Sequence, residues 1–207
     1  MKRTVFQLLM LLPLVVSPSS FQAEPAQQRH WEETTTETIW RGRYTNCDYG
    51  YYVLLPAGMV AHGSHAPAPN HGFLVALPDV LRTSAASFDE PRFVWLDASY
   101  NASDYQALAD VANYELDLTK QDKRAFRVVE RGLARLAGLP AVRFTVEYQA
   151  REGVVVEEQI VALRSGIVYT IGLRTVGADR SLDEQRFQTI RNGFRLLNLP
   201  RGQCSNR

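Results

Sequence analysis

Two stretches in the second half of the chain alternate regularly between apolar and polar residues. They lie at 142–148 and 167–173, and an apolar run at 154–163 stands between them. Strict alternation is typical of strands that have one buried and one wet face. Because glycine-containing turns separate the three segments, the pattern predicts successive antiparallel hairpins across residues 142–175.

Three shorter apolar runs earlier in the chain also predict strands. They cover residues 51–55, 73–77 and 93–96, and the first two are followed directly by proline. Their β-branched and aromatic residues suit a pleated surface. Residues 57–70 are rich in glycine and proline and predict a loop.

Helical spacing first appears after residue 103. Ser103 and Gln106 have the spacing of a capping box, which predicts that a helix begins there. Four apolar residues then recur on one helical face: Tyr105, Leu108, Ala112 and Leu116.

A second capping box, Ser181 with Glu184, predicts a helix that Pro200 ends. Its apolar face carries Phe187, Ile190, Phe194 and Leu197. Strands, a helix, hairpin strands and a final helix together predict an α+β fold, in which helices pack on an antiparallel sheet.

The N-terminus has the pattern of a secretory signal peptide. Lys2 and Arg3 precede an apolar run at 5–16, and small residues follow. This run is shorter than the roughly 20 apolar residues that cross a bilayer. We therefore expect a signal peptide at 1–23, a flexible leader at 24–39 and a single domain at 40–207. The alternative is an uncleaved anchor or a buried helix.

Composition and charge narrow the class of protein. Apolar residues make up 45% of the chain, and 23 basic residues balance 22 acidic ones. This composition is that of an ordinary globular protein, and it lacks the basic excess of nucleic-acid binders. We expect a secreted or periplasmic protein with no nucleic-acid partner and, once the signal is removed, no integral membrane span.

Cys47 and Cys204 are the two cysteines of the chain. An even count in an exported protein favours a disulfide. Their wide separation argues against a redox CxxC motif and against a zinc site, which needs closely spaced ligands. Two free thiols in a reducing compartment remain the alternative.

Three histidines, His62, His65 and His71, lie within ten residues of one another, in the glycine- and proline-containing sequence 61–71. Three imidazoles could hold zinc, copper or nickel and leave one position open. Their spacing matches no zinc-protease motif, and a solvated loop is the preferred interpretation. A metal-binding protein or metal-dependent enzyme is the alternative.

Four tyrosines surround Cys47: Tyr44, Tyr49, Tyr51 and Tyr52. Exposed aromatic rings could stack on a glycan or anchor a protein partner. The preferred interpretation is that these rings pack under the edge of the sheet around the disulfide.

Several short motifs resemble the PsbP-like family. They lie at 53–58, 136–141, 166–171 and 187–194, and the resemblance covers most of residues 50–198. It implies an α-β-α sandwich in an exported, non-enzymatic accessory or binding protein. We expect no cofactor, and an envelope or extracellular protein partner. The family has no shared catalytic set to carry over. The clustered histidines and the cysteine pair are not part of its pattern.

Overall fold

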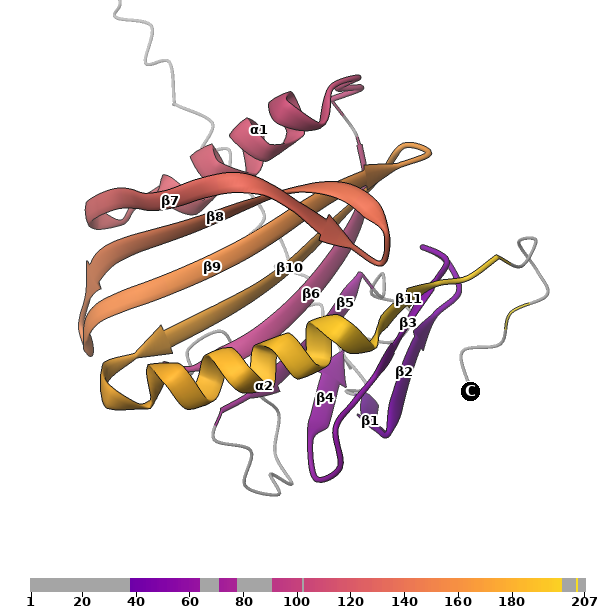
Figure 1. Cartoon of the computed structure of the whole chain (residues 1–207), viewed down its shortest axis with the longest axis horizontal. Helices are drawn as coiled ribbons and strands as arrows, with labels where there is room; N and C mark the ends of the chain where they lie inside the picture. The colour runs from indigo at the N-terminus through magenta and orange to yellow at the C-terminus, as the bar shows by residue number, and fades with distance from the viewer. Residues whose placement is uncertain (1–37, 64–70, 78–90, 102, 199–203, 205–207) are drawn as a thin grey trace, which may run out of the picture. The chain divides into compact units, whose positions relative to one another are not determined.

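The computed structural model in Figure 1 describes the part of the chain that carries the fold. All described residues belong to the unit Thr35–Arg207. They are residues 38–63, 71–77, 91–101, 103–198 and 204.

Eight strands of this part form one sheet, in which every neighbouring pair is antiparallel. Across the sheet the order is β1 (Thr38–Arg41), β4 (Val60–Gly63), β5 (Gly72–Ala76), β6 (Phe93–Tyr100), β10 (Ile167–Val176), β9 (Gly153–Arg164), β8 (Leu139–Ala150) and β7 (Arg124–Leu136). The predicted hairpins across residues 142–175 are confirmed, because β8 pairs with β9 and β9 pairs with β10.

A smaller sheet joins the two ends of the described chain. Its order is β11 (Phe194–Leu196), β3 (Tyr51–Leu54) and β2 (Arg43–Asn46), again antiparallel. Figure 1 shows the late strand β11 beside the early strands β2 and β3. This pairing brings Leu196 close to the turn that contains Cys47, because Leu196 and Asn46 both pair with Tyr51.

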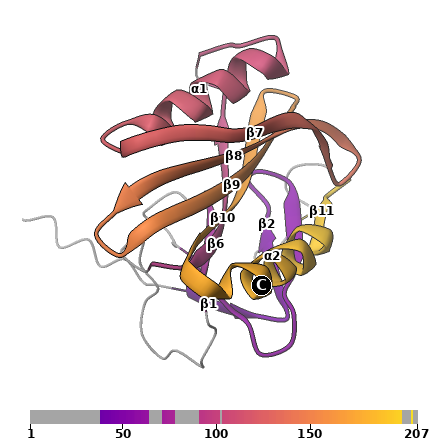
Figure 2. The ribbon, with the colours of Figure 1, turned by 60° about the vertical axis from the view of Figure 1, so that its left-hand side comes forward.

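Two helices complete the α+β class, which is confirmed. They are α1 (Leu108–Lys120) and α2 (Arg180–Gly193), the latter preceded by the short 3-10 turn η1 (Gly177–Asp179). Tyr169 of β10 belongs to the core cluster that includes Phe187 of α2, whereas its neighbour Val168 belongs to the cluster that includes Val111 of α1. Adjacent residues of a strand point to opposite faces of a sheet, so each helix contacts its own face of β10. Strands β7 to β10 lie between the two helices in Figure 2.

The first helix begins later than its sequence predicts. Ala107 is its N-cap residue, with no side-chain cap, so the predicted capping box at Ser103 is wrong. Asn101 accounts for the difference, because its Nδ2 donates to the Tyr105 carbonyl at 2.7 Å and its Oδ1 accepts from the Tyr105 amide at 3.2 Å. An asparagine that satisfies the backbone locally competes with the first helical turn.

The second helix differs from its prediction at both ends. It begins at Arg180 without a side-chain cap, so Ser181 lies inside its first turn and forms no capping box. It ends at Gly193, where a Cβ atom would lie 2.3 Å from the carbonyl oxygen of Leu54. This close approach lets Phe194 leave the helix and pair with Val53 of β3. Phe187, Ile190 and Phe194 are buried as predicted, whereas Leu197 is half-buried and lies beyond the helix.

Five strands of the described part were not predicted: β1, β2, β4, β7 and β11. β4 lies within the segment expected to be a loop, because its four residues are too few to show a period above the surrounding glycines. β7 has no continuous apolar face and is exposed along most of its length. As the last strand of the sheet it pairs with β8 through its backbone, which its side-chain pattern does not reveal.

Candidate binding site at the disulfide end of the sheet

Cys47 and Cys204 form the predicted disulfide, with an Sγ–Sγ distance of 2.04 Å and a Cα–Cα distance of 5.5 Å. Cys47 follows β2, in the turn that leads to β3. The bond therefore attaches Cys204 to the turn between two strands of the smaller sheet.

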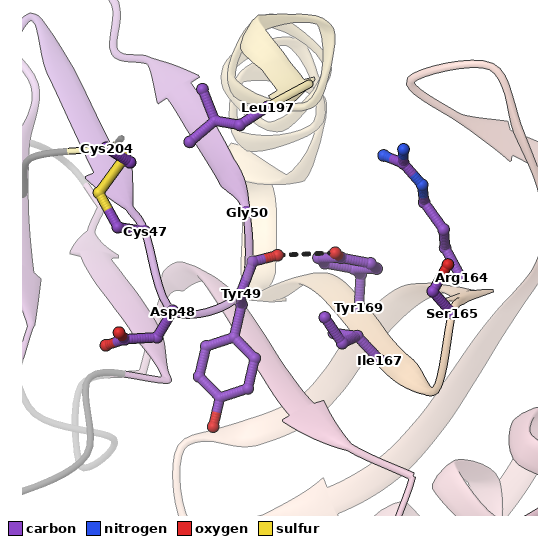
Figure 3. A pocket seen from close by; sticks show the side chains of 10 residues that line it. All are labelled: Cys47, Asp48, Tyr49, Gly50, Arg164, Ser165, Ile167, Tyr169, Leu197 and Cys204. Carbon is purple, nitrogen blue, oxygen red and sulfur yellow. Dashed lines mark hydrogen bonds between the residues drawn. A yellow bond between two sulfur atoms is a disulfide. The ribbon is translucent and has the colours of Figure 1, made fainter. Parts of the chain in front are cut away.

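A hollow of about 210 Å³ opens beside this disulfide. Figure 3 shows the disulfide on one side of it and Arg164 on the other. Its lining comes from the β2–β3 turn, the β9–β10 turn and the C-terminal segment: Cys47, Asp48, Tyr49, Gly50, Arg164, Ser165, Ile167, Tyr169, Leu197 and Cys204.

Hydrogen bonds between distant segments hold the walls of this disulfide hollow. The Tyr169 hydroxyl donates to the Tyr49 carbonyl at 2.7 Å, and the Leu197 amide donates to the Gly50 carbonyl at 2.8 Å. Burial raises the pKa of Tyr169, and the charge of nearby Arg164 offsets part of that rise. The Tyr169 hydroxyl therefore keeps its proton and remains a donor.

Arg164 is half-buried at the end of β9 and lies between two hollows. The second hollow, toward the β7–β8 turn, is lined by Ala137, Leu139, Arg164, Arg195, Leu196 and Asn198. Arg195 is engaged there, because its Nη1 donates to the carbonyls of Asn192 and Phe194 at 2.6 and 2.8 Å. Across the described residues, the Arg164 guanidinium has no hydrogen-bond or ion-pair partner. No sequence motif marked Arg164, since its place depends on the two turns beside it.

The tyrosines around Cys47 are mostly part of the core. Tyr44 and Tyr51 are fully buried and Tyr49 is 5% exposed. The Tyr44 hydroxyl donates to the Gly72 carbonyl and the Tyr51 hydroxyl to the His71 carbonyl. A buried ring cannot stack on a sugar, so these three form no glycan platform in this arrangement. Tyr52 is half-buried beneath the Arg43 guanidinium, which lies 4.1 Å from its ring centroid.

The structure separates two of the clustered histidines, and His65 lies outside the described residues. His62 is buried on β4 opposite Leu74, while Gly63 faces Phe73. His71 instead lies on the same face of the sheet as Phe73. Its Nδ1 contacts the hydroxyl of Tyr49 at 3.0 Å, and Tyr49 and Phe73 belong to the same core cluster. Since adjacent strand positions alternate, His62 and His71 lie on opposite faces of the sheet.

The ring of His71 is also engaged. Its Nδ1 lies 2.9 Å from the Ala98 carbonyl. A carbonyl oxygen only accepts, so Nδ1 carries the proton and only Nε2 keeps a lone pair. Within the described ranges, no group of three or more His, Cys, Asp or Glu side chains gathers as metal ligands.

We expect metal titration to give no tight binding. Because His62 and His71 face opposite sides, a shared ion would require the sheet edge to open, which would offset much of the coordination energy. Calorimetric titration of the metal-free protein with zinc and copper, beside a variant with all three histidines replaced by alanine, measures this. Stoichiometric submicromolar binding that disappears in the variant would contradict the expectation.

A polar network that no sequence motif predicted lies beneath α1. Buried Glu157 accepts hydrogen bonds from Tyr148 at 2.9 Å, Gln159 at 2.6 Å and Lys123 at 3.2 Å. Gln159 also donates to the Thr119 hydroxyl at 2.8 Å. Burial and the neighbouring Glu157 carboxylate raise the pKa of Tyr148. Both oxygens of Glu157 accept hydrogen bonds. Because Gln159 belongs to β9 and Thr119 to α1, the network joins the helix to the sheet.

Comparison with known proteins identifies the fold. The sequence matches no protein-family model and no curated protein. The structure is similar to cyanobacterial PsbP (CyanoP) from Synechocystis sp. PCC 6803, with a TM-score of 0.51 and 15% identity over 77% of this chain and 92% of that one. The fold is PsbP-like. This confirms the resemblance seen in the sequence at the level of the fold.

A second solved structure similar to the PsbP-like chain is LpqN, a protein involved in cell envelope biogenesis of Mycobacterium tuberculosis. The TM-score is 0.47 with 14% identity, over 80% of this chain and 87% of that one. Among the helices of the described part, neither has the length and apolar character that a membrane crossing needs.

Breaking the disulfide should weaken this PsbP-like domain. Replacing both cysteines with serine is expected to lower the free energy of unfolding by about 2–4 kcal/mol, because the reduced unfolded chain regains the entropy of a very long loop. Urea unfolding of the oxidised protein and the double variant measures the difference. Reduced wild-type protein is the control and should match the variant; equal midpoints for oxidised protein and variant would contradict the prediction.

Proposed function

We propose that this protein is an exported, non-enzymatic accessory protein that binds a protein partner at the cell envelope or outside the cell. Its disulfide suits an oxidising compartment. The signal-like N-terminus and the PsbP-like fold support the same compartment and an α-β-α sandwich arrangement. We assign residues 1–23 to the signal peptide, 24–39 to a leader whose last two residues enter β1, and 40–207 to the single binding domain.

The observation that carries the proposal is the position of Arg164. It is half-buried between two hollows and has no ion-pair partner in the described structure. Tyrosine, isoleucine and leucine side chains stand beside it. Arginine with neighbouring aromatic and apolar groups is the usual composition of an energetic centre in protein interfaces. A carboxylate of the partner would pair with the guanidinium in two parallel hydrogen bonds.

The chemistry of Arg164 also favours binding over catalysis. A guanidinium keeps its proton at physiological pH and donates from a fixed planar fork. It therefore recognises a carboxylate geometrically and is unsuited to the proton transfers of a general acid or base.

Capture experiments with matched variants test the proposal. Affinity-tagged mature protein is crosslinked in intact cells, and captured proteins are identified by mass spectrometry for wild type, Arg164→Glu and Arg151→Glu. Arg151 is an exposed arginine in the β8–β9 turn and serves as the control. We expect one protein to be captured by wild type and by Arg151→Glu, and its yield to fall about tenfold with Arg164→Glu, because a like charge replaces the attraction.

Equal capture by both variants would contradict the proposed site. Release of the captured material by free sugars would favour a glycan-binding module instead. Circular dichroism of each variant shows whether the fold is intact.

Export is tested separately. The mature protein is expected to start between residues 18 and 27, and its mass should be about 2–3 kDa below that of the full chain. Mass spectrometry of the exported protein measures both values. An intact Met1 terminus on exported protein would contradict cleavage.

A further inference from the structure

Strand β7 forms one edge of the large sheet. It runs for 13 residues, and in the described part of the chain it pairs with β8 alone. Figure 1 shows it as the outermost strand beyond β8. An edge strand presents a row of unpaired backbone N–H and C=O groups, on which another extended segment can add.

The two halves of β7 differ in regularity. The register with β8 shifts between Arg124 and Arg127 and again between Val128 and Glu130. From Glu130 opposite Thr145 to Leu136 opposite Leu139 the register is unbroken. Bulges twist an edge away from new partners, so residues 130–136 are the part of the strand suited to pairing.

We call residues 130–136 the docking edge. On one face of this edge, charged and apolar side chains alternate. Arg131, Leu133 and Arg135 share one face, because they are spaced two residues apart on a regular strand. Leu133 is 93% exposed. In the part of the chain that is described, Arg131 has no ion-pair or hydrogen-bond partner. Glu130, on the other face, is already paired with Arg143.

Protection of the edge explains only part of this pattern. Charged residues on an edge strand do discourage aggregation. A leucine exposed at the centre of the regular stretch has the opposite effect, because it adds apolar surface where a new strand would pair. The strand also carries four arginines and one glutamate, so two copies of β7 would repel each other.

We propose that residues 130–136 bind an extended acidic segment of a protein partner by strand addition. The segment would place an acidic residue opposite each of Arg131 and Arg135 and an apolar residue opposite Leu133, in the pattern acid–x–apolar–x–acid. Backbone hydrogen bonds supply affinity, and the alternate side chains supply specificity. None of residues 130–136 lines the hollows beside Arg164, so this surface is additional to the proposed partner site.

A synthetic peptide tests the proposal directly. The fluorescent, end-capped peptide Ser-Thr-Glu-Thr-Val-Thr-Glu-Thr-Ser has the required pattern, and its binding to the mature protein is followed by anisotropy at low salt. A matched peptide with lysine in place of both glutamates should bind at least about tenfold more weakly, since each cross-strand charge pair becomes repulsive. In the double variant Arg131→Glu/Arg135→Glu, the preference should reverse in favour of the lysine peptide.

N-methylated peptides test whether the peptide pairs with β7 through its backbone amides. Two further peptides carry N-methyl groups on alternate residues, one on the odd positions and one on the even positions. Since only alternate amides of an added strand face the edge, one of these peptides should lose binding and the other should retain it. Leu133→Ala should weaken the binding of the acidic peptide to the protein. The control Arg151→Glu should leave this binding unchanged.

Several results would overturn the proposal. One is that the acidic peptide binds the double variant as tightly as it binds wild type. Another is that the two N-methylated peptides bind equally well. A further one is that correctly folded wild-type protein does not bind the acidic peptide. The arginines would then serve only to protect the edge from aggregation. A fourth is self-association of the full mature chain that the double variant abolishes, because the occupant would then be a second copy. Since Arg164→Glu leaves this edge intact, failure here and failure of the partner site are distinguishable.

Discussion

Replacing Arg92 with alanine is expected to lower the free energy of unfolding by about 3–5 kcal/mol, because the buried carboxylate of Asp183 would lose its hydrogen-bonded cation. The remaining cation, Arg186, has its Nη1 3.8 Å from Asp183 Oδ1 and forms no hydrogen bond with it. Asp183 is fully buried in the first turn of α2. Arg92 Nε and Nη2 donate to its two oxygens at 2.7 and 2.6 Å. The Thr175 hydroxyl adds a hydrogen bond at 2.7 Å, which cannot replace the charge.

Chemical denaturation measures this loss, and the exposed pair of Arg180 with Glu184 offers a matched control. Arg180→Ala should change the free energy of unfolding by no more than about 0.5 kcal/mol, because the surrounding water already screens that pair. Adding Asp183→Asn to Arg92→Ala should recover part of the loss by removing a buried carboxylate that has lost its two hydrogen bonds from Arg92. An Arg92→Ala variant within about 1 kcal/mol of wild type would contradict this account.

Replacing Phe194 with alanine is expected to cost about 3–5 kcal/mol, because a large cavity would open where the two sheets meet. Phe194 is fully buried. Its ring stacks on Tyr51 with a centroid distance of 5.4 Å and meets the edge of Tyr169 at 5.8 Å. These partners come from β3 and β10, so the cavity would loosen contacts between both sheets.

The free energy of unfolding of Phe194→Ala is compared with that of Leu182→Ala. Leu182 is 46% exposed on α2, and its truncation should cost well under half as much as that of Phe194, since far less buried surface is lost. A loss below about 1 kcal/mol at Phe194 would show that this junction packs loosely.

The candidate site shows how unequally sequence information is distributed. The disulfide was predictable because cysteine has a single common structural use in an exported chain. Arg164 was not, because nothing in its neighbours along the chain distinguishes it from other surface arginines. Only the approach of the β2–β3 turn and the C-terminal segment gives it a hollow to line. The histidines show the reverse case, in which neighbours in sequence are placed on opposite faces of the sheet.

Local sequence was enough to predict the central hairpins, the α+β class, the pairing of the cysteines and the burial of Phe187, Ile190 and Phe194. Each of these follows from a periodic apolar face or a distinctive residue type, which local sequence records. Other features could not be predicted from the local pattern: where the helices begin and end, and the strands β1, β2, β4, β7 and β11. These features depend on backbone pairing and on contacts between distant segments: Asn101 holding Tyr105, Gly193 against Leu54, and β11 beside β3. Such contacts leave no period in the chain, because the partners that satisfy them lie elsewhere in the sequence.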